Sequence, residues 1–216
     1  MSNDELQLSV TEELIWDPKV DSNAIAVTAE EGVVTLRGTV GTLREKREAK
    51  KDAERVYGVK HVTNELDVQI MNDERRANAD LRGDILHALT LNTLVPATID
   101  ADVADGFVTL TGTADWQFQR DEAEFVASNV PGVISVTDDV RLVSPGPSAH
   151  DVQHSIKKAM ERNAKLDAES VSVESENGTV TLRGTVSSWA DHDEAVSTAW
   201  AAPGVTRVKD HILVAY

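Results

Sequence analysis

The chain has 216 residues, no cysteine and a formal net charge of −16 at pH 7. The missing cysteines exclude disulfide bridges and thiolate chemistry, and the negative charge repels phosphate backbones, so nucleic-acid binding is not expected. No apolar run approaches the roughly 20 residues that span a bilayer, and the first residues lack the basic and then apolar pattern of a secretory leader. We therefore expect a cytoplasmic protein without a transmembrane segment.

Nine glycines recur in three sets that keep the same internal spacing. The sets are Gly32, Gly38 and Gly58; Gly106, Gly112 and Gly132; and Gly178, Gly184 and Gly204. Self-similarity at a fixed period indicates a repeat architecture. We predict three homologous units at residues 1–71, 72–146 and 147–216, in which these glycines have structural roles.

The first element expected in each unit is an amphipathic helix. In the first unit Leu6, Val10 and Leu14 are spaced by four residues, which places them on one helical face. The same pattern returns in the other two units, at Leu81, Ile85 and Leu89 and at Val152, Ile156 and Met160.

Two short strands joined by a tight turn come next. Apolar residues alternate before and after the dipeptide Glu31-Gly32, and an Asp-Gly or Asn-Gly pair stands at the same place in the other units. Such pairs favour hairpin turns whose residues need positive φ. Gly38 lies inside the second strand, where glycine usually marks a bulge or a close approach of another backbone segment.

A second helix and a third strand complete the unit. The helix is expected to begin at the capping box formed by Thr42 and Glu45 and to end at Gly58. Apolar residues then alternate from Val62 to Val68. Because the apolar positions of the strands share one face, we predict an α+β fold: three tandem αββαβ units, each a three-stranded mixed sheet with two helices on one face.

The repeated strings resemble the BON domain, named for bacterial osmotically induced and nodulation proteins. The first copy reads "GVVTLRGTV", then "YGV" and "VTNELDV", and the later copies read "GFVTLTGTA…PGVISVTDDVRLV" and "GTVTLRGTV…PGVTRVKDHILV". The resemblance implies an αββαβ fold, no catalytic activity and a role in osmotic or envelope stress. It also implies binding to phospholipid membranes, and a relative joined to a peptidoglycan-type module binds potassium.

We therefore expect a non-enzymatic binding or scaffold protein that needs no cofactor and that associates with a phospholipid surface. Two alternatives remain open, namely a sensor of a small ion such as potassium or of another ligand, and a scaffold for protein partners in the cytoplasm. No nucleophile and base pair, phosphate-binding loop or metal cluster recurs among the three copies.

Basic residues concentrate in the second helix of the first unit, at Arg44, Arg47, Lys50, Lys51 and Arg55. Acidic residues are interleaved with them, which is typical of an exposed helix held by ion pairs. The alternative is a site for an anionic partner, either lipid headgroups or the acidic second unit.

A polar residue recurs at one inward position of the third strand, as Asn64, Asp138 and Asp210. A buried polar group is normally hydrogen-bonded, so we expect these side chains to cap backbone groups, with ligand binding as the alternative. His150 and His154 lie four residues apart on an expected helix, a weak metal candidate that lacks a third ligand. Most of the four tryptophans are expected to pack inside the protein, with contact to a membrane interface as the alternative.

Overall fold

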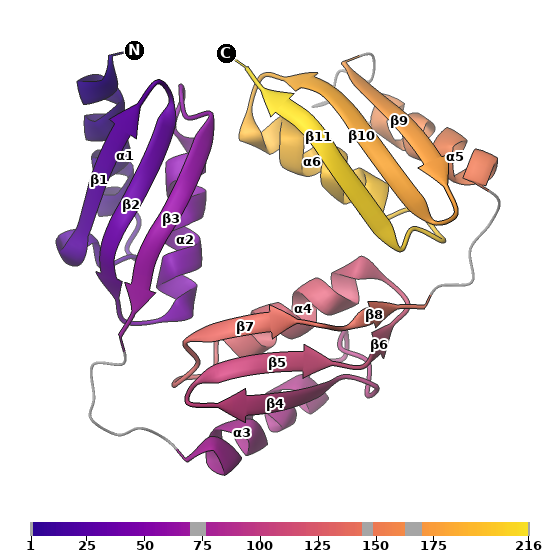
Figure 1. Ribbon diagram of the computed structural model, residues 1–216, viewed down its shortest axis with the longest axis horizontal. Helices are drawn as coiled ribbons and strands as arrows, with labels where there is room; N and C mark the ends of the chain where they lie inside the picture. Colours follow the sequence, from indigo (N-terminus) through magenta and orange to yellow (C-terminus); the bar gives the residue numbers. More distant parts are fainter. Residues whose placement is uncertain (1, 70–76, 144–148, 163–169, 216) are drawn as a thin grey trace. The chain divides into compact units, whose positions relative to one another are not determined.

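The computed structural model describes residues 2–69, 77–143, 149–162 and 170–215. These residues form three repeats of the same αββαβ topology, as the sequence predicted, and each repeat is described by itself below. Figure 1 shows two helices covering one face of the sheet in each repeat. None of the helices in the described part of the chain is both long enough and apolar enough to span a bilayer.

The first repeat consists of α1 (Asn3–Trp16), the short 3-10 helix η1 (Ser22–Ala24), β1 (Ile25–Glu30), β2 (Val33–Val40), α2 (Leu43–Arg55) and β3 (His61–Val68). Strand β2 is central, with β1 antiparallel and β3 parallel to it. The capping box at Thr42 and Glu45 begins α2 as predicted, with both of its hydrogen bonds formed.

Packing in the first repeat follows the periodicities of the sequence. Leu14 of α1, Leu36 of β2 and Leu66 of β3 are fully or almost fully buried. Ala49 and Ala53 of α2 have no exposed surface, so this helix lies close to its neighbours. Alternation along the strands directs apolar residues toward the helices and leaves the opposite face polar, where Arg37 and Glu65 form an ion pair at 2.6 Å.

The backbone geometry at two positions explains why the repeated string contains glycine there. Glu31 and Gly32 have φ of 51° and 89°, the pair of positive values that a type I′ hairpin requires. Gly38 has φ of 129°, and a Cβ atom on it would stand 1.9 Å from the carbonyl oxygen of Ala24. Only glycine admits so close an approach of the preceding backbone. All nine glycines of the three sets have positive φ.

The second repeat consists of α3 (Asn78–Leu91), β4 (Asp100–Ala104), β5 (Phe107–Thr111), β6 (Thr113–Ala114), α4 (Gln117–Ser128), β7 (Ser135–Asp138) and β8 (Arg141–Leu142). Its strands form a three-stranded part, β4-β5-β7, and a two-stranded part, β6-β8, instead of the single sheet expected. The break falls at Gly112, which has φ of 119° and would place a Cβ 2.1 Å from the Thr98 carbonyl oxygen. The strands therefore keep their direction while the regular ladder is interrupted.

The third repeat consists of α5 (Ala149–Arg162), β9 (Val171–Glu176), β10 (Thr179–Val186), α6 (Trp189–Trp200) and β11 (Arg207–Val214). Its central strand β10 is antiparallel to β9 and parallel to β11, as in the first repeat. Ile156 and Met160 of α5 and Leu182 of β10 are almost fully buried in its core.

Candidate functional site

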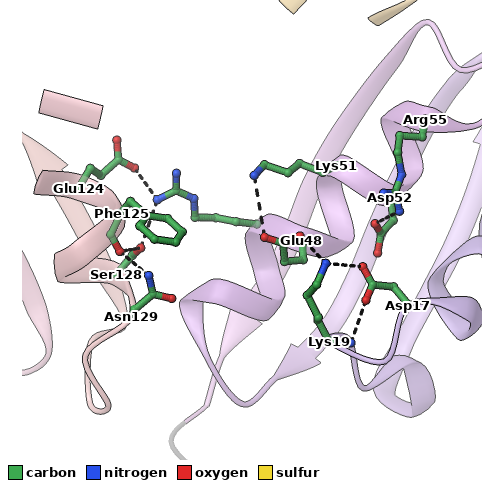
Figure 2. A network of polar contacts seen from close by, with 11 residues as sticks. Asp17, Lys19, Glu48, Lys51, Asp52, Arg55, Glu124, Phe125, Ser128 and Asn129 are labelled. Carbon is green, nitrogen blue, oxygen red and sulfur yellow. Dashed lines mark hydrogen bonds and ion pairs between the residues drawn. The ribbon is translucent and has the colours of Figure 1, made fainter. Parts of the chain in front are cut away.

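The basic residues of α2 lie beside acidic residues of the same repeat. Lys50 Nζ is 3.3 Å from Glu54 Oε1, and Lys51 Nζ is 3.9 Å from Glu48 Oε1, as Figure 2 shows for the second pair. Arg44 is exposed in the first turn and forms no ion pair with any residue that the structure describes. The helix therefore has ion pairs along its length, and Arg44 lies outside them among the described residues.

Exposure separates these cations from their acidic partners. The side chain of Lys51 is 60% exposed and that of Glu48 only 18%, while Lys50 is 49% exposed and Glu54 16%. The carboxylates thus lie against the fold and the ammonium groups extend past them. An approaching surface would meet positive charge first, although α2 has four acidic residues beside its six basic ones.

The second helices of the other repeats do not have this outer layer. Helix α4, with sequence QFQRDEAEFVAS, has Arg120 as its single basic residue among three acidic ones. Helix α6, with sequence WADHDEAVSTAW, has neither lysine nor arginine. The basic face is a property of the first repeat alone among these three helices.

Arg47 and Arg55, the remaining basic candidates, differ in their surroundings. Arg47 is half-buried in α2. Arg55 Nη2 pairs with Asp52 of its own helix and lies 3.1 Å from Glu13 Oε1 of α1. Arg55 therefore joins the two helices of the first repeat while its side chain remains 58% exposed.

Asp52 is the unusual group beneath this face. It is 1% exposed, and its neighbours in α2 on the inward side are Ala49 and Ala53. Burial raises the pKa of Asp52 from its ordinary value of 3.8 to about 6, although Arg55 opposes the change. Sequence reasoning missed this residue. The one available signal was that Asp52 lies three residues after Ala49 and so shares the inward face of the helix.

The recurring polar position of the third strand connects that strand to the second helix. Asn64 Nδ2 donates to the carbonyl oxygen of Lys46 in α2 at 2.7 Å, and Asn64 Oδ1 accepts from the amide of Leu66 at 3.2 Å. In the third repeat, Asp210 Oδ1 accepts from the amide of Ile212 at 2.9 Å. Asp138 occupies the equivalent place in β7 and is half-buried.

His192 of α6 is a second group that sequence reasoning missed. Its Nε2 is 2.7 Å from Asp210 Oδ2, and its Nδ1 is 3.1 Å from Asp193 Oδ1. Hydrogen bonding to Asp193 and the charge and hydrogen bond of Asp210 raise the pKa of His192 above its usual value, against the effect of burial. Trp189 contacts the imidazole edge-on, with ring centroids 4.9 Å apart.

The two histidines that the sequence offered as a weak metal site are only partly covered by the structure. His154 is exposed on α5, and the side chain of His150 lies outside the described residues. Within the described part of the chain, no group of three or more His, Cys, Asp or Glu residues is arranged to hold a metal ion. Of the tryptophans, Trp16 is 84% exposed at the end of α1, whereas Trp116, Trp189 and Trp200 are partly buried.

A family model for the BON domain matches the chain three times, at residues 2–70, 77–144 and 148–216. The chain therefore belongs to the BON domain family and contains three tandem copies, which confirms the resemblance seen in the sequence. It is similar to Osmotically-inducible protein Y of Escherichia coli (strain K12), with 31% identity over 146 residues, which cover 65% of this chain and 73% of that protein.

Two solved structures also align with most of the chain. CdsD, a structural protein of the type III secretion system of Chlamydia trachomatis, aligns over 98% of this chain and 92% of its own, with 16% identity and a TM-score of 0.27. The PrgH periplasmic domain aligns over 95% and 99%, with 11% identity and a TM-score of 0.24.

Proposed function

We propose that this tandem BON protein is a non-enzymatic binding protein of osmotic or envelope stress, and that its first repeat docks on an anionic phospholipid surface through α2. The observation that carries the proposal is the outer layer of cations on α2, whose ammonium groups are more exposed than their carboxylate partners. The stress context is supported by family membership and by the similarity to Osmotically-inducible protein Y.

The attraction has to be local because the whole chain carries a net charge of −16. At physiological salt the Debye length is about 8 Å, so distant negative charges are screened once α2 is close to the surface. A basic residue near an anionic leaflet contributes about 1 kcal/mol. Docking through one basic helix is therefore compatible with an acidic protein, and added salt weakens it.

Two large apolar residues are exposed at the end of α1. Trp16 is 84% and Ile15 66% exposed at the end of α1. Both helices cover the same face of the first sheet (Figure 1), so their outer sides belong to one helical layer. Tryptophan is enriched where one side of a ring meets lipid and the other meets water.

Sedimentation with vesicles tests the proposal, using phosphatidylcholine alone and mixed with phosphatidylglycerol. The test variant is Arg44→Gln, Lys50→Gln and Lys51→Gln combined. The control is Lys157→Gln, Lys158→Gln and Arg162→Gln, three exposed residues of α5 that change the net charge equally. Three basic residues correspond to about 3 kcal/mol, or roughly a 150-fold loss of affinity for the mixed vesicles.

The two variants separate a local site from an effect of net charge. We expect the α2 variant to lose binding to phosphatidylglycerol vesicles and the α5 variant to keep most of it. Equal losses in both variants would contradict a site on α2. Absence of binding by the parent protein to either vesicle would refute the lipid proposal and favour a scaffold for protein partners.

A further inference from the structure

The carboxylate of Asp52 is buried, but only one of its two oxygens accepts a hydrogen bond among the described residues. Its Oδ1 accepts from Arg55 Nη2, whereas its Oδ2 has less than 1 Å² of accessible surface and no hydrogen-bond partner among the described residues. A buried carboxylate normally has all its acceptor positions filled, because an unmet one loses its hydration without replacement. The ionised form of Asp52 therefore depends on Arg55, its one hydrogen-bond partner among the described residues.

Arg55 divides its guanidinium between two acidic groups. It pairs with Asp52 on its own helix and lies 3.1 Å from Glu13 Oε1 of α1. Asp52 is almost completely buried, whereas the side chain of Arg55 is 58% exposed. The guanidinium of Arg55 is thus held by a buried carboxylate, while much of the Arg55 side chain is exposed to solvent.

Further charges face Asp52 from the segment after α1 and from α2 itself. Asp17 is 7% exposed, accepts from the amide of Lys19 at 2.9 Å, and has its Oδ2 3.3 Å from Lys19 Nζ. The same Lys19 Nζ lies 3.6 Å from Glu48 Oε2 (Figure 2). The negative charges of Asp17 and Glu48 oppose ionisation of Asp52, as does Glu13 on α1.

The strands packed under α2 add no titratable group to this cluster. Their buried positions are Val34, Leu36 and Val40 on β2 and Val62 and Leu66 on β3, and the polar residue between the last two is Asn64. Four carboxylates, those of Glu13, Asp17, Glu48 and Asp52, therefore share three cations, those of Lys19, Lys51 and Arg55. With one more anion than cations, this cluster favours uptake of a proton.

Asp52 is the member that takes up the proton. Burial raises its pKa to about 6, with Arg55 opposing and the neighbouring carboxylates contributing. Asp17 behaves in the opposite way, because the hydrogen bond from the Lys19 amide lowers its pKa. As the pH falls from 7.5 to 5.5, Asp52 changes from mostly ionised to mostly neutral while Asp17 keeps its charge.

We propose that Asp52 is a proton switch for the α2 surface: on protonation it releases the guanidinium of Arg55 from their ion pair, leaving Glu13 as the charged partner of Arg55, and strengthens the attraction of α2 for anionic lipid. The release of Arg55 follows from the geometry of the first repeat, and the lipid step rests on the proposed function. The neutral carboxyl also removes one negative charge from beneath the basic layer, which acts in the same direction.

The release is tested without lipid, by following the side-chain Nε resonance of Arg55 in the full chain between pH 5 and 8. We expect it to shift with a midpoint near pH 6 in the parent and to stay at its acid-form position in Asp52→Asn. The control is Asp67→Asn, an exposed change of β3 with the same charge difference, which should titrate like the parent. An Arg55 signal that does not move in the parent, or that moves equally in Asp52→Asn, overturns the switch.

The lipid step is tested with vesicles of phosphatidylglycerol and phosphatidylcholine in a ratio of one to three. One additional effective charge near the surface corresponds to about a fivefold change in affinity. Between pH 7.5 and pH 5.5, we expect the affinity of the parent to increase about fivefold more than that of Asp52→Asn. We also expect Asp52→Asn to bind at pH 7.5 as tightly as the parent does at pH 5.5.

The outcomes of the two experiments are distinguishable. Equal pH dependence in the parent and in Asp52→Asn overturns the coupling between Asp52 and lipid binding. If no variant binds vesicles at any pH, the proposed function fails and the lipid step fails with it. The Arg55 titration decides the release of the guanidinium independently of that result.

Discussion

Replacing the buried carboxyl of Asp52 by an amide is expected to stabilise the first repeat at neutral pH. The pKa of Asp52 rises from 3.8 to about 6 on folding, so the folded state binds the proton more tightly than the unfolded state. The cost of ionisation is absent below about pH 4, increases as the pH rises through 6, and is constant above about pH 7. Asp52→Asn removes this cost because asparagine has nearly the same shape and stays neutral.

The magnitude follows from the size of the pKa change. A shift of one unit corresponds to about 1.4 kcal/mol, so the change from 3.8 to about 6 amounts to about 3 kcal/mol. This value already includes the attraction of Arg55 for the ionised carboxylate, which opposes the rise. An asparagine oxygen can also still accept a hydrogen bond from Arg55. We expect Asp52→Asn to be more stable than the parent by up to about 3 kcal/mol at pH 7.5.

Native-state hydrogen exchange in the full chain measures this difference for the first repeat alone. The amides of Ala49 and Ala53 lie in the buried part of α2 and report its opening. Protection in Asp52→Asn should exceed that of the parent at pH 7.5, and the difference should shrink toward pH 5. Asp67→Asn should show no such change. Equal or lower protection in Asp52→Asn at pH 7.5 would refute the reasoning, because the ionised carboxylate would then be stabilising.

Three further predictions concern His192 in the third repeat and Gly38 and Asn64 in the first. Hydrogen bonding to Asp193 and Asp210 raises the pKa of His192, so its stabilising effect is present below about pH 6.5 and is lost as the pH rises through the raised pKa. Hydrogen exchange of α6 should therefore increase from pH 6 to 8 in the parent more than in His192→Gln, and equal increases would contradict this. Gly38→Ala should destabilise the first repeat by at least about 2 kcal/mol in thermal unfolding, because its Cβ would meet the Ala24 carbonyl at 1.9 Å. Its control, Gly83→Ala, meets nothing within 4 Å on α3 and should stabilise by up to about 1 kcal/mol; a similar loss in both would contradict the close-approach argument. Asn64→Ala removes the hydrogen bond to the Lys46 carbonyl of α2 and the one from the Leu66 amide within β3, and it should cost about 1 to 3 kcal/mol in denaturant unfolding. A cost near zero would show that these bonds add nothing.

The secondary structure of this protein follows closely from its sequence because the signals are local. The spacing of Leu6, Val10 and Leu14 defines one face of α1, and all three residues are buried. The capping box at Thr42 and Glu45 begins α2, since its two hydrogen bonds join residues three positions apart. The turn at Glu31 and Gly32 has the positive φ values that its residue types favour.

The candidate site was less accessible to the same reasoning. The sequence located the basic helix but not the inward position of its acidic residues, which depends on how α2 is rotated against α1. The sequence also gave no indication that the hydrogen-bonded strand ladder of the second repeat breaks at Gly112. The equivalent glycines of the other two repeats also have positive φ, and their ladders continue. Both features depend on contacts between segments that are distant in the chain.

The sequence by itself therefore determined the repeat, the order of helices and strands, and the glycines at the turns, because periodicity and backbone sterics act over a few residues. Only the tertiary structure decided that Asp52 is buried, that Arg55 connects it to Glu13, and that His192 lies against Asp210. A carboxylate in a charged helix has the same sequence signature whether it faces water or another helix. Its chemistry changes only when packing removes the water and chooses its neighbours, which is a property of the folded repeat.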